Sequence, residues 1–286
     1  MRLIATLLLL AASSAWGATQ VPDGKWRFQF VDNKGRADRP IEVFTYRPRR
    51  CDSRCPMVFL MAGAKREASN YLRHWETIAD VQQLILVAPA FQPKAWPRAA
   101  GYNFGDVAGQ PDREKWAFSA IEHLFDALRD GQEGYTIFGH GAGAQFVQRM
   151  AILRPDNRAT VMVAANPGFY AMPEWRKEKG AEPYPYSLLG SPVADTELRR
   201  ALAKRFILMV GERDDDPDEE GLGKGAAAMK QGEGRVERGE NFIKAATAAA
   251  AELGVPLKWE MHEIPDTAHD GEAISRAAAR ILYGKK

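Results

Sequence analysis

The stretch that decides the fold is YTIFGHGAGAQFVQRM, Tyr135–Met150. It begins with a short apolar run, passes through a turn with three glycines and ends in the pattern of an amphipathic helix. A strand, a sharp turn and a helix in this order form the context of a nucleophile elbow, where the serine of a Gly-x-Ser-x-Gly motif is exposed. Here the motif reads GHGAG over residues 139–143, so Gly141 stands at the nucleophile position.

Strand and helix patterns alternate on both sides of this stretch. Two alternating segments near the start predict antiparallel strands at a sheet edge, and the continuous apolar runs further on predict strands buried on both faces. The two edge segments are 25–30 and 41–48, and the buried runs are 56–63, 83–90, 159–167 and 205–214, with a last strand at 257–265. Amphipathic segments separate them, which predicts an α/β protein with a mostly parallel, doubly wound sheet and helices on both faces.

Composition and the first residues narrow the class of protein. The 286 residues are 45% hydrophobic and 27% charged, which is typical of a globular chain. A formal charge of +2 predicts no nucleic-acid partner. Residues 1–17 have the pattern of a signal peptide, with Arg2, an apolar run over 3–12 and small residues before the cut. That run is shorter than the roughly 20 residues a bilayer requires, so we expect a secreted or periplasmic protein without a membrane segment after cleavage.

We expect one domain over 18–286, and within it a lid-like insertion over 168–204, which is rich in proline and aromatic residues. A plain surface loop is the alternative for that segment. The two cysteines, Cys51 and Cys55, predict a disulfide in an exported chain, although a small loop gains little from closure. Free thiols are the alternative. Two cysteines are too few for a zinc site, and the sequence predicts neither a metal nor a cofactor.

Three segments carry the residues of one predicted site. In a parallel sheet the site lies at the carboxyl ends of the strands. Gly141 follows one predicted strand, Asp214 follows another, and His269 comes after the last strand and before the last helix. The order nucleophile, acid, histidine is that of a serine hydrolase with the elbow described above. We therefore expect these three positions to meet.

The sequence resembles a family of bacterial α/β-hydrolases related in layout to esterases and polyester depolymerases. Two segments, YNFGDV at 102–107 and QGEGRVERGENF at 231–242, match the family in kind. The resemblance rests mainly on five others and covers nearly all of the chain after residue 17. They are MAGAKREA at 61–68, GHGAGAQFV at 139–147, AANPGFYAMP at 164–173, GERDDDP at 211–217 and AHDG at 268–271. The resemblance implies the α/β-hydrolase fold, His269 as base and Asp214 as acid, with Asp216 as the reserve candidate. It also implies an oxyanion hole formed by the backbone amides of Ala64 and Ala142.

Two residues depart from the family pattern, and both fall on the chemistry. Gly141 replaces the serine, and Ala62 stands where a histidine is usual. Glycine adopts the backbone angles of such a turn without the strain that a side chain brings. The favoured interpretation is a degenerate hydrolase that binds a small or polymeric ester-like ligand with little turnover.

Three other interpretations stay open. One is a slow hydrolase in which Asp214 and His269 activate a water. Another is a serine esterase whose serine was replaced, and the last is a non-catalytic scaffold. Tyr102, Phe169 and Tyr170 are candidates for lining a ligand pocket, and ordinary packing explains such aromatic residues equally well.

Overall fold

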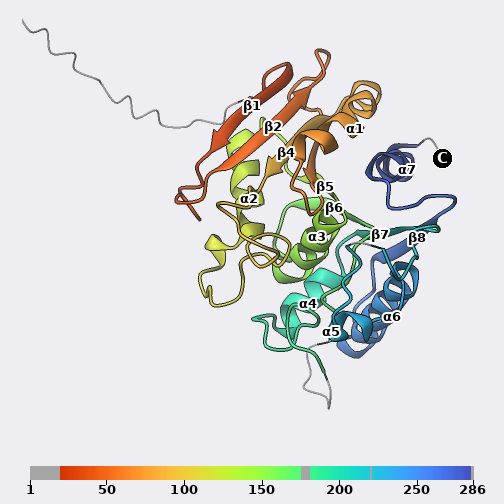
Figure 1. Cartoon of the computed structure of the whole chain (residues 1–286). Coiled ribbons are helices and arrows are strands. Elements are labelled where there is room, and N and C mark those ends of the chain that lie inside the picture. Colours follow the sequence, from red (N-terminus) through yellow and green to blue (C-terminus); the bar gives the residue numbers. More distant parts are fainter. Residues whose placement is uncertain (1–19, 175–180, 220, 285–286) are drawn as a thin grey trace, which may run out of the picture.

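The computed structural model describes residues 20–174, 181–219 and 221–284, and these form one twisted sheet with helices packed on it (Figure 1). The strands are β1 (Gly24–Phe30), β2 (Ile41–Arg47), β3 (Met57–Met61), β4 (Ile85–Ala90), β5 (Tyr135–His140), β6 (Ala159–Ala165), β7 (Phe206–Gly211) and β8 (Trp259–Ile264). The helices are α1 (Ala68–Gln82), α2 (Ala117–Leu128), α3 (Ala142–Leu153), α4 (Asp195–Leu202), α5 (Ala226–Met229), α6 (Arg235–Leu253) and α7 (Gly271–Tyr283), and a short 3₁₀ turn lies at Arg113–Lys115.

The order and direction of the strands place the predicted site residues together, at the carboxyl ends of the parallel strands. The eight strands run β1-β2-β4-β3-β5-β6-β7-β8, and only the pairs β1–β2 and β2–β4 are antiparallel. The remaining neighbours are parallel, with Met61 of β3 opposite Gly139 of β5 and with His140 of β5 opposite Ala165 of β6. The loops after β3, β5, β7 and β8 therefore leave the sheet at the carboxyl ends of the parallel strands, as expected for a parallel α/β sheet.

Helices cover both faces of the sheet, as the sequence predicts. One core contains Trp75 of α1 and Ile274 of α7, packed on one face. The other contains Ile121 of α2, Phe146 of α3 and Phe242 of α6 on the opposite face. The strands between them are buried on both sides, which explains why their sequences read as continuous apolar runs rather than alternating ones.

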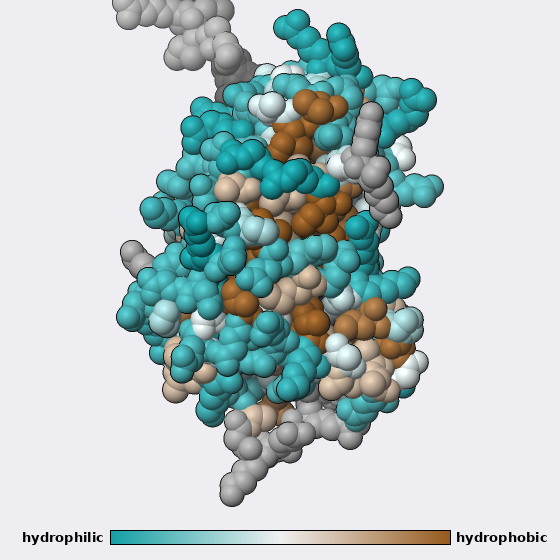
Figure 2. Space-filling model, turned by 90° about the vertical axis from the view of Figure 1, so that its right-hand side faces the viewer, coloured by the Kyte–Doolittle hydropathy of each residue, from teal (hydrophilic) through white to brown (hydrophobic). Residues whose placement is uncertain are grey.

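The face that carries α7 is largely hydrophilic, with apolar patches separated by polar side chains (Figure 2). Within the described ranges, no helix combines the length and apolar character needed to cross a bilayer. Residues 1–17, the predicted signal peptide, lie outside the described residues.

Two other predictions concern local structure. Cys51 and Cys55 form the predicted disulfide just before β3, and both side chains are buried. In the predicted lid, residues 175–180 also lie outside the described residues. The described parts of that segment include isolated bridges between Met172 and Ser187 and between Pro183 and Leu189.

Candidate active site

The turn at Gly141 has the backbone geometry of an elbow. Gly141 caps α3 directly after β5, with φ +57° and ψ −115°. Residues other than glycine rarely adopt these backbone angles. A Cβ placed on Gly139 would lie 2.2 Å from the carbonyl oxygen of Gly143, and one on Gly143 would lie 2.0 Å from that of Met61. At Gly141 the nearest atom would be Nε2 of His269, at 3.3 Å. The turn is therefore closed by backbone on two sides and faces the imidazole of His269 on the third.

The acid and the histidine lie together beside this turn. The Nδ1 atom of His269 is 2.6 Å from Oδ2 of Asp214, which follows β7. The Asp214 side chain is fully buried, whereas that of His269 is 29% exposed. Asp216 instead lies in an exposed turn, where its carboxylate accepts a hydrogen bond from the amide of Asp218 at 2.8 Å. Of the two acid candidates, the structure brings only Asp214 to His269.

Asp214 is also held from behind by residues that the sequence analysis did not assign. Nη1 of Arg235 donates to Oδ1 of Asp214 at 2.5 Å, and the same nitrogen contacts the carboxylate of Glu219. Arg235 is the first residue of α6 and is buried. No feature of the sequence distinguishes it from the other arginines near it, so only the packing of α6 against the loop after β7 reveals the contact.

A second imidazole lies against His269. The ring centroids of His140 and His269 are 4.4 Å apart, and Nδ1 of His140 lies 2.9 Å from the hydroxyl of Tyr71. Burial raises the pKa of Tyr71 to about 12, so its hydroxyl is protonated at neutral pH and can donate to Nδ1. Burial, together with the charges of His269 and Arg235, holds the pKa of His140 well below its usual value. The ring packed on His269 is therefore neutral at neutral pH.

The predicted oxyanion amides lie on the two loops that meet at the turn. Ala142 is the first residue of α3, where a helix leaves its N–H without an internal acceptor. Ala64 lies in the exposed loop between β3 and α1. Across the residues that the structure describes, neither amide donates to a protein acceptor. Their role in binding an oxyanion stays a prediction. Ala62, at the departure from the family pattern, is buried, and its carbonyl oxygen accepts a hydrogen bond from Tyr102 at 2.7 Å.

The aromatic candidates for ligand contact pack against the protein itself. Tyr102 and Tyr170 are 1% and 0% exposed, and Phe169 is 9% exposed. Tyr170 stacks on Phe242 with ring centroids 4.5 Å apart, and Phe169 stacks on Tyr186 at 5.0 Å. Contact between these rings and a ligand stays a prediction. For the two buried tyrosines it would require the residues packed over them to move.

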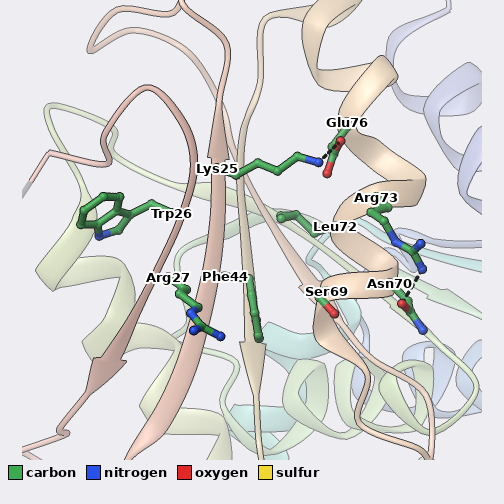
Figure 3. Close-up of a pocket in the computed structure, with 9 residues that line it drawn as sticks. All are labelled: Lys25, Trp26, Arg27, Phe44, Ser69, Asn70, Leu72, Arg73 and Glu76. Carbon is green, nitrogen blue, oxygen red and sulfur yellow. Dashed lines mark hydrogen bonds and ion pairs between the residues drawn. The ribbon is translucent and has the colours of Figure 1, made fainter.

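A large groove lies away from the turn at Gly141. It measures about 660 Å³ and lies between the edge strands and α1, where Lys25 reaches across to Glu76 with a separation of 2.8 Å (Figure 3). Phe44 and Leu72 contribute apolar walls. None of the lining residues belongs to the site at Gly141, so the size of a cavity does not locate the chemistry here.

The acid side also offers three potential cation ligands. Donor atoms of Asp214, Glu219 and His269 lie within 4.8 Å of one another. However, Arg235 already bridges the two carboxylates, so a cation would have to displace a buried guanidinium. The arrangement suits an acid–base pair better than a metal.

The parallel sheet, the elbow and the acid–histidine pair define the class of the protein as an α/β-hydrolase. No protein-family model matches the chain, and a search of curated proteins finds no match. Among solved structures, poly(aspartic acid) hydrolase-1 from Sphingomonas sp. KT-1 is 31% identical, with a TM-score of 0.84 over 92% of this chain and 100% of that one. LpqC, a poly(3-hydroxybutyrate) depolymerase from Bordetella parapertussis, is 30% identical, with a TM-score of 0.83 over 92% and 91%.

The chain belongs to the α/β-hydrolase family that contains these two proteins, which confirms the resemblance at the level of the family. An S-formylglutathione hydrolase from Agrobacterium tumefaciens shares the fold at 18% identity, with a TM-score of 0.56 over 90% of this chain and 92% of that one.

Proposed function

We propose that the chain is a degenerate esterase-type hydrolase that binds an ester-like or polymeric ligand with little turnover. In this proposal Asp214 and His269 form the acid–base pair, the amides of Ala64 and Ala142 form the oxyanion hole, and Gly141 marks the vacant nucleophile position. The observation that carries the proposal is the 3.3 Å between His269 Nε2 and a Cβ built on Gly141. This distance supports a role for His269 as the base that would deprotonate a hydroxyl at residue 141.

Low turnover follows from the chemistry that the hydroxyl normally supplies. A serine forms a covalent intermediate and thereby splits one difficult step into two easier ones. Without it, a water must attack the carbonyl directly while His269 removes its proton. Backbone donors and ligand binding still support a residual rate enhancement of roughly 10³–10⁴ over the uncatalysed reaction. Loss of the nucleophile therefore lowers the rate of hydrolysis far more than it weakens ligand binding.

The retained acid–base pair favours slow hydrolysis by water as the second candidate function. His269 is 29% exposed, its Nδ1 is engaged by Asp214, and its Nε2 faces the space beside Gly141. A general base must come within about 2.6–3.2 Å of the group that it deprotonates. A water beside Gly141 would meet that requirement.

The ligand class and the compartment are proposed on separate grounds. Two similar proteins of known structure, 31% and 30% identical, are named for the hydrolysis of polymers, poly(aspartic acid) in one case and poly(3-hydroxybutyrate) in the other. A polymeric ligand with a hydrolysable carbonyl is therefore the favoured class. The Cys51–Cys55 disulfide supports a secreted or periplasmic location, because disulfides persist in oxidising compartments. Mass spectrometry of the exported protein should find Ala18 as the first residue.

The test compares p-nitrophenyl ester hydrolysis by the native chain and by Gly141→Ser. We expect very low activity in the native chain and a gain on the order of 10³-fold or more in the variant. Substantial native activity that disappears in His269→Ala would support the water mechanism instead. No activity in either protein, with both folded, would contradict the proposal and favour a non-catalytic scaffold.

A further inference from the structure

Four charged or titratable side chains form a line that ends at the site. Glu219 contacts Arg235, Arg235 donates to Oδ1 of Asp214 at 2.5 Å, and Oδ2 of Asp214 is 2.6 Å from Nδ1 of His269. The side chains of Arg235 and Asp214 are 1% and 0% exposed. The two oxygens of the acid are thus divided between a guanidinium and an imidazole, away from water.

The backbone holds Arg235 in this position. It is the first residue of α6, and the amide of the next residue, Val236, donates to the carboxylate of Asp215 at 3.0 Å. Asp215 and Asp214 are adjacent, so the loop after β7 is fastened to the start of α6 by two consecutive carboxylates. A shift of α6 would therefore move the acid relative to His269.

Arg238, one helical turn later, provides a contrast. It is equally buried, but its guanidinium donates to backbone carbonyl oxygens, those of Gly168 at 2.5 Å, Gly232 at 2.8 Å and Gly223 at 3.1 Å. Arg238 therefore fastens loops without pairing with a carboxylate of the site. The two arginines separate a structural role from an electrostatic one.

We propose that Arg235 is a positioning residue that fixes the carboxylate of Asp214 and, with Glu219, sets the charge that His269 experiences. The roles of Asp214 and His269 rest on the proposed function, but the ion pairs do not. A buried pair is tuned by each charge near it because the interior screens charges weakly. Arg235 offsets the negative charge of Asp214, and Glu219 in turn offsets Arg235.

The sign of each effect on His269 follows from this line of charges. Asp214 favours the imidazolium form, Arg235 opposes it, and Glu219 weakens that opposition. On the other side, His140 from β5 packs its neutral ring on His269, and Asp270 follows it in the chain with its carboxylate capping α7. Removing the charge of Arg235 should let the His269–Asp214 pair keep its proton to a higher pH. Removing the charge of Glu219 should have the opposite effect.

The experiment follows the Cε1 proton of His269 by NMR across a pH titration of the full chain. Arg235→Gln should move the titration midpoint upward, and Glu219→Gln should move it downward by less. Arg235→Lys, which keeps the charge, should remain close to the native midpoint. The matched control is Arg238→Gln, which should leave the midpoint unchanged if the variant folds.

Opposite shifts in Arg235→Gln and Glu219→Gln would support the proposal, because a purely structural role predicts no such reversal. An unchanged midpoint in both variants, or shifts in the same direction, would overturn it. If Arg235→Gln does not fold, Glu219→Gln and Arg235→Lys still decide. A Gly141→Ser variant without activity would contradict the proposed function and leave this result intact, so the two failures are distinguishable.

Discussion

The two halves of the candidate site, the turn at Gly141 and the acid side at Asp214, differ in whether backbone or side chains set their geometry. At the turn, the geometry resides in the backbone: Gly141 has φ +57°, and the carbonyl oxygens of Met61 and Gly143 close around its neighbouring glycines. On the acid side, the geometry resides in side chains, with Asp214 buried between Arg235 and His269. Glycine at residue 141 lets the turn keep its backbone angles without side-chain strain, whereas loss of one charge on the acid side would leave a buried partner unpaired.

The largest expected effect tests whether the acid side still supports catalysis. In a Gly141→Ser background, Asp214→Asn should lower kcat for p-nitrophenyl ester hydrolysis by a factor on the order of 10⁴, because the histidine is then held in the wrong tautomer. Asp216→Asn is the matched control, since its carboxylate only closes an exposed turn. An equal loss in both variants would show that the acid has been misassigned.

The next effect compares two of the three glycines of the turn in the native background. Gly143→Ala should reduce the free energy of unfolding by more than about 4 kcal/mol, because its Cβ would meet the Met61 carbonyl oxygen at 2.0 Å. Gly141→Ala should cost only about 1–3 kcal/mol, the strain of a side chain at positive φ. Urea unfolding measures both. Equal costs would mean that residue 141 is not the open position of the turn.

Two buried histidines should give the stability opposite pH dependences. The pKa of His140 is depressed by burial, so the unfolded chain binds a proton that the folded chain does not, and stability falls as the pH drops below about 6.5. For His123, burial is outweighed by hydrogen bonds to Asp32 and Glu114, which raise its pKa. Its contribution is present below about pH 6.5 and is lost as the pH rises through the raised value.

Urea unfolding at a series of pH values checks both signs. His140→Asn should flatten the decline in stability below pH 6.5 by at most the slope that one bound proton produces. His123→Asn should lower stability below pH 6.5 and change its slope with pH only above that value. If His140→Asn changed the slope above pH 6.5 instead, the conclusion that the His140 ring is neutral in the folded chain would be wrong.

The smallest effect concerns the link between the two loops at the turn. The Tyr71 hydroxyl lies 2.9 Å from His140 Nδ1 and also lies close to Gly63, next to Ala64. Tyr71→Phe should reduce the free energy of unfolding by about 1 kcal/mol, the usual net worth of one hydrogen bond. A loss that exceeds the one in Gly143→Ala would reverse the ranking of backbone over side chain at this turn.

Much of the fold and part of the site could be predicted from the sequence, for physical reasons. The strands are buried on both faces, so their apolar runs at 56–63 and 205–214 stand out without any alignment. The order of Gly141, Asp214 and His269 along the chain, together with the rule that sites lie at strand ends, predicts that they meet. In the structure His269 Nδ1 is 2.6 Å from Asp214 Oδ2, and His269 Nε2 is 3.3 Å from the position of a Cβ on residue 141.

The rest depends on contacts that no pattern encodes. Arg235 is one of four charged residues in the segment GRVERGE, and only the docking of α6 decides which of them reaches Asp214. Similarly, Tyr71 and His140 are 69 positions apart and meet because the first turn of α1 lies beside the last residue of β5. The choice between Asp214 and Asp216 also needed the turn geometry, since both follow the same strand.

The most direct test of the central claim is covalent labelling of residue 141. The Gly141→Ser variant and the native chain would be treated with a fluorophosphonate, and the adducts located by peptide mass spectrometry. If residue 141 is the vacant nucleophile position, the adduct lies on the introduced serine, disappears in the additional His269→Ala variant, and is absent from the native chain. Labelling of another serine, or a folded Gly141→Ser variant that remains unlabelled, would contradict the account.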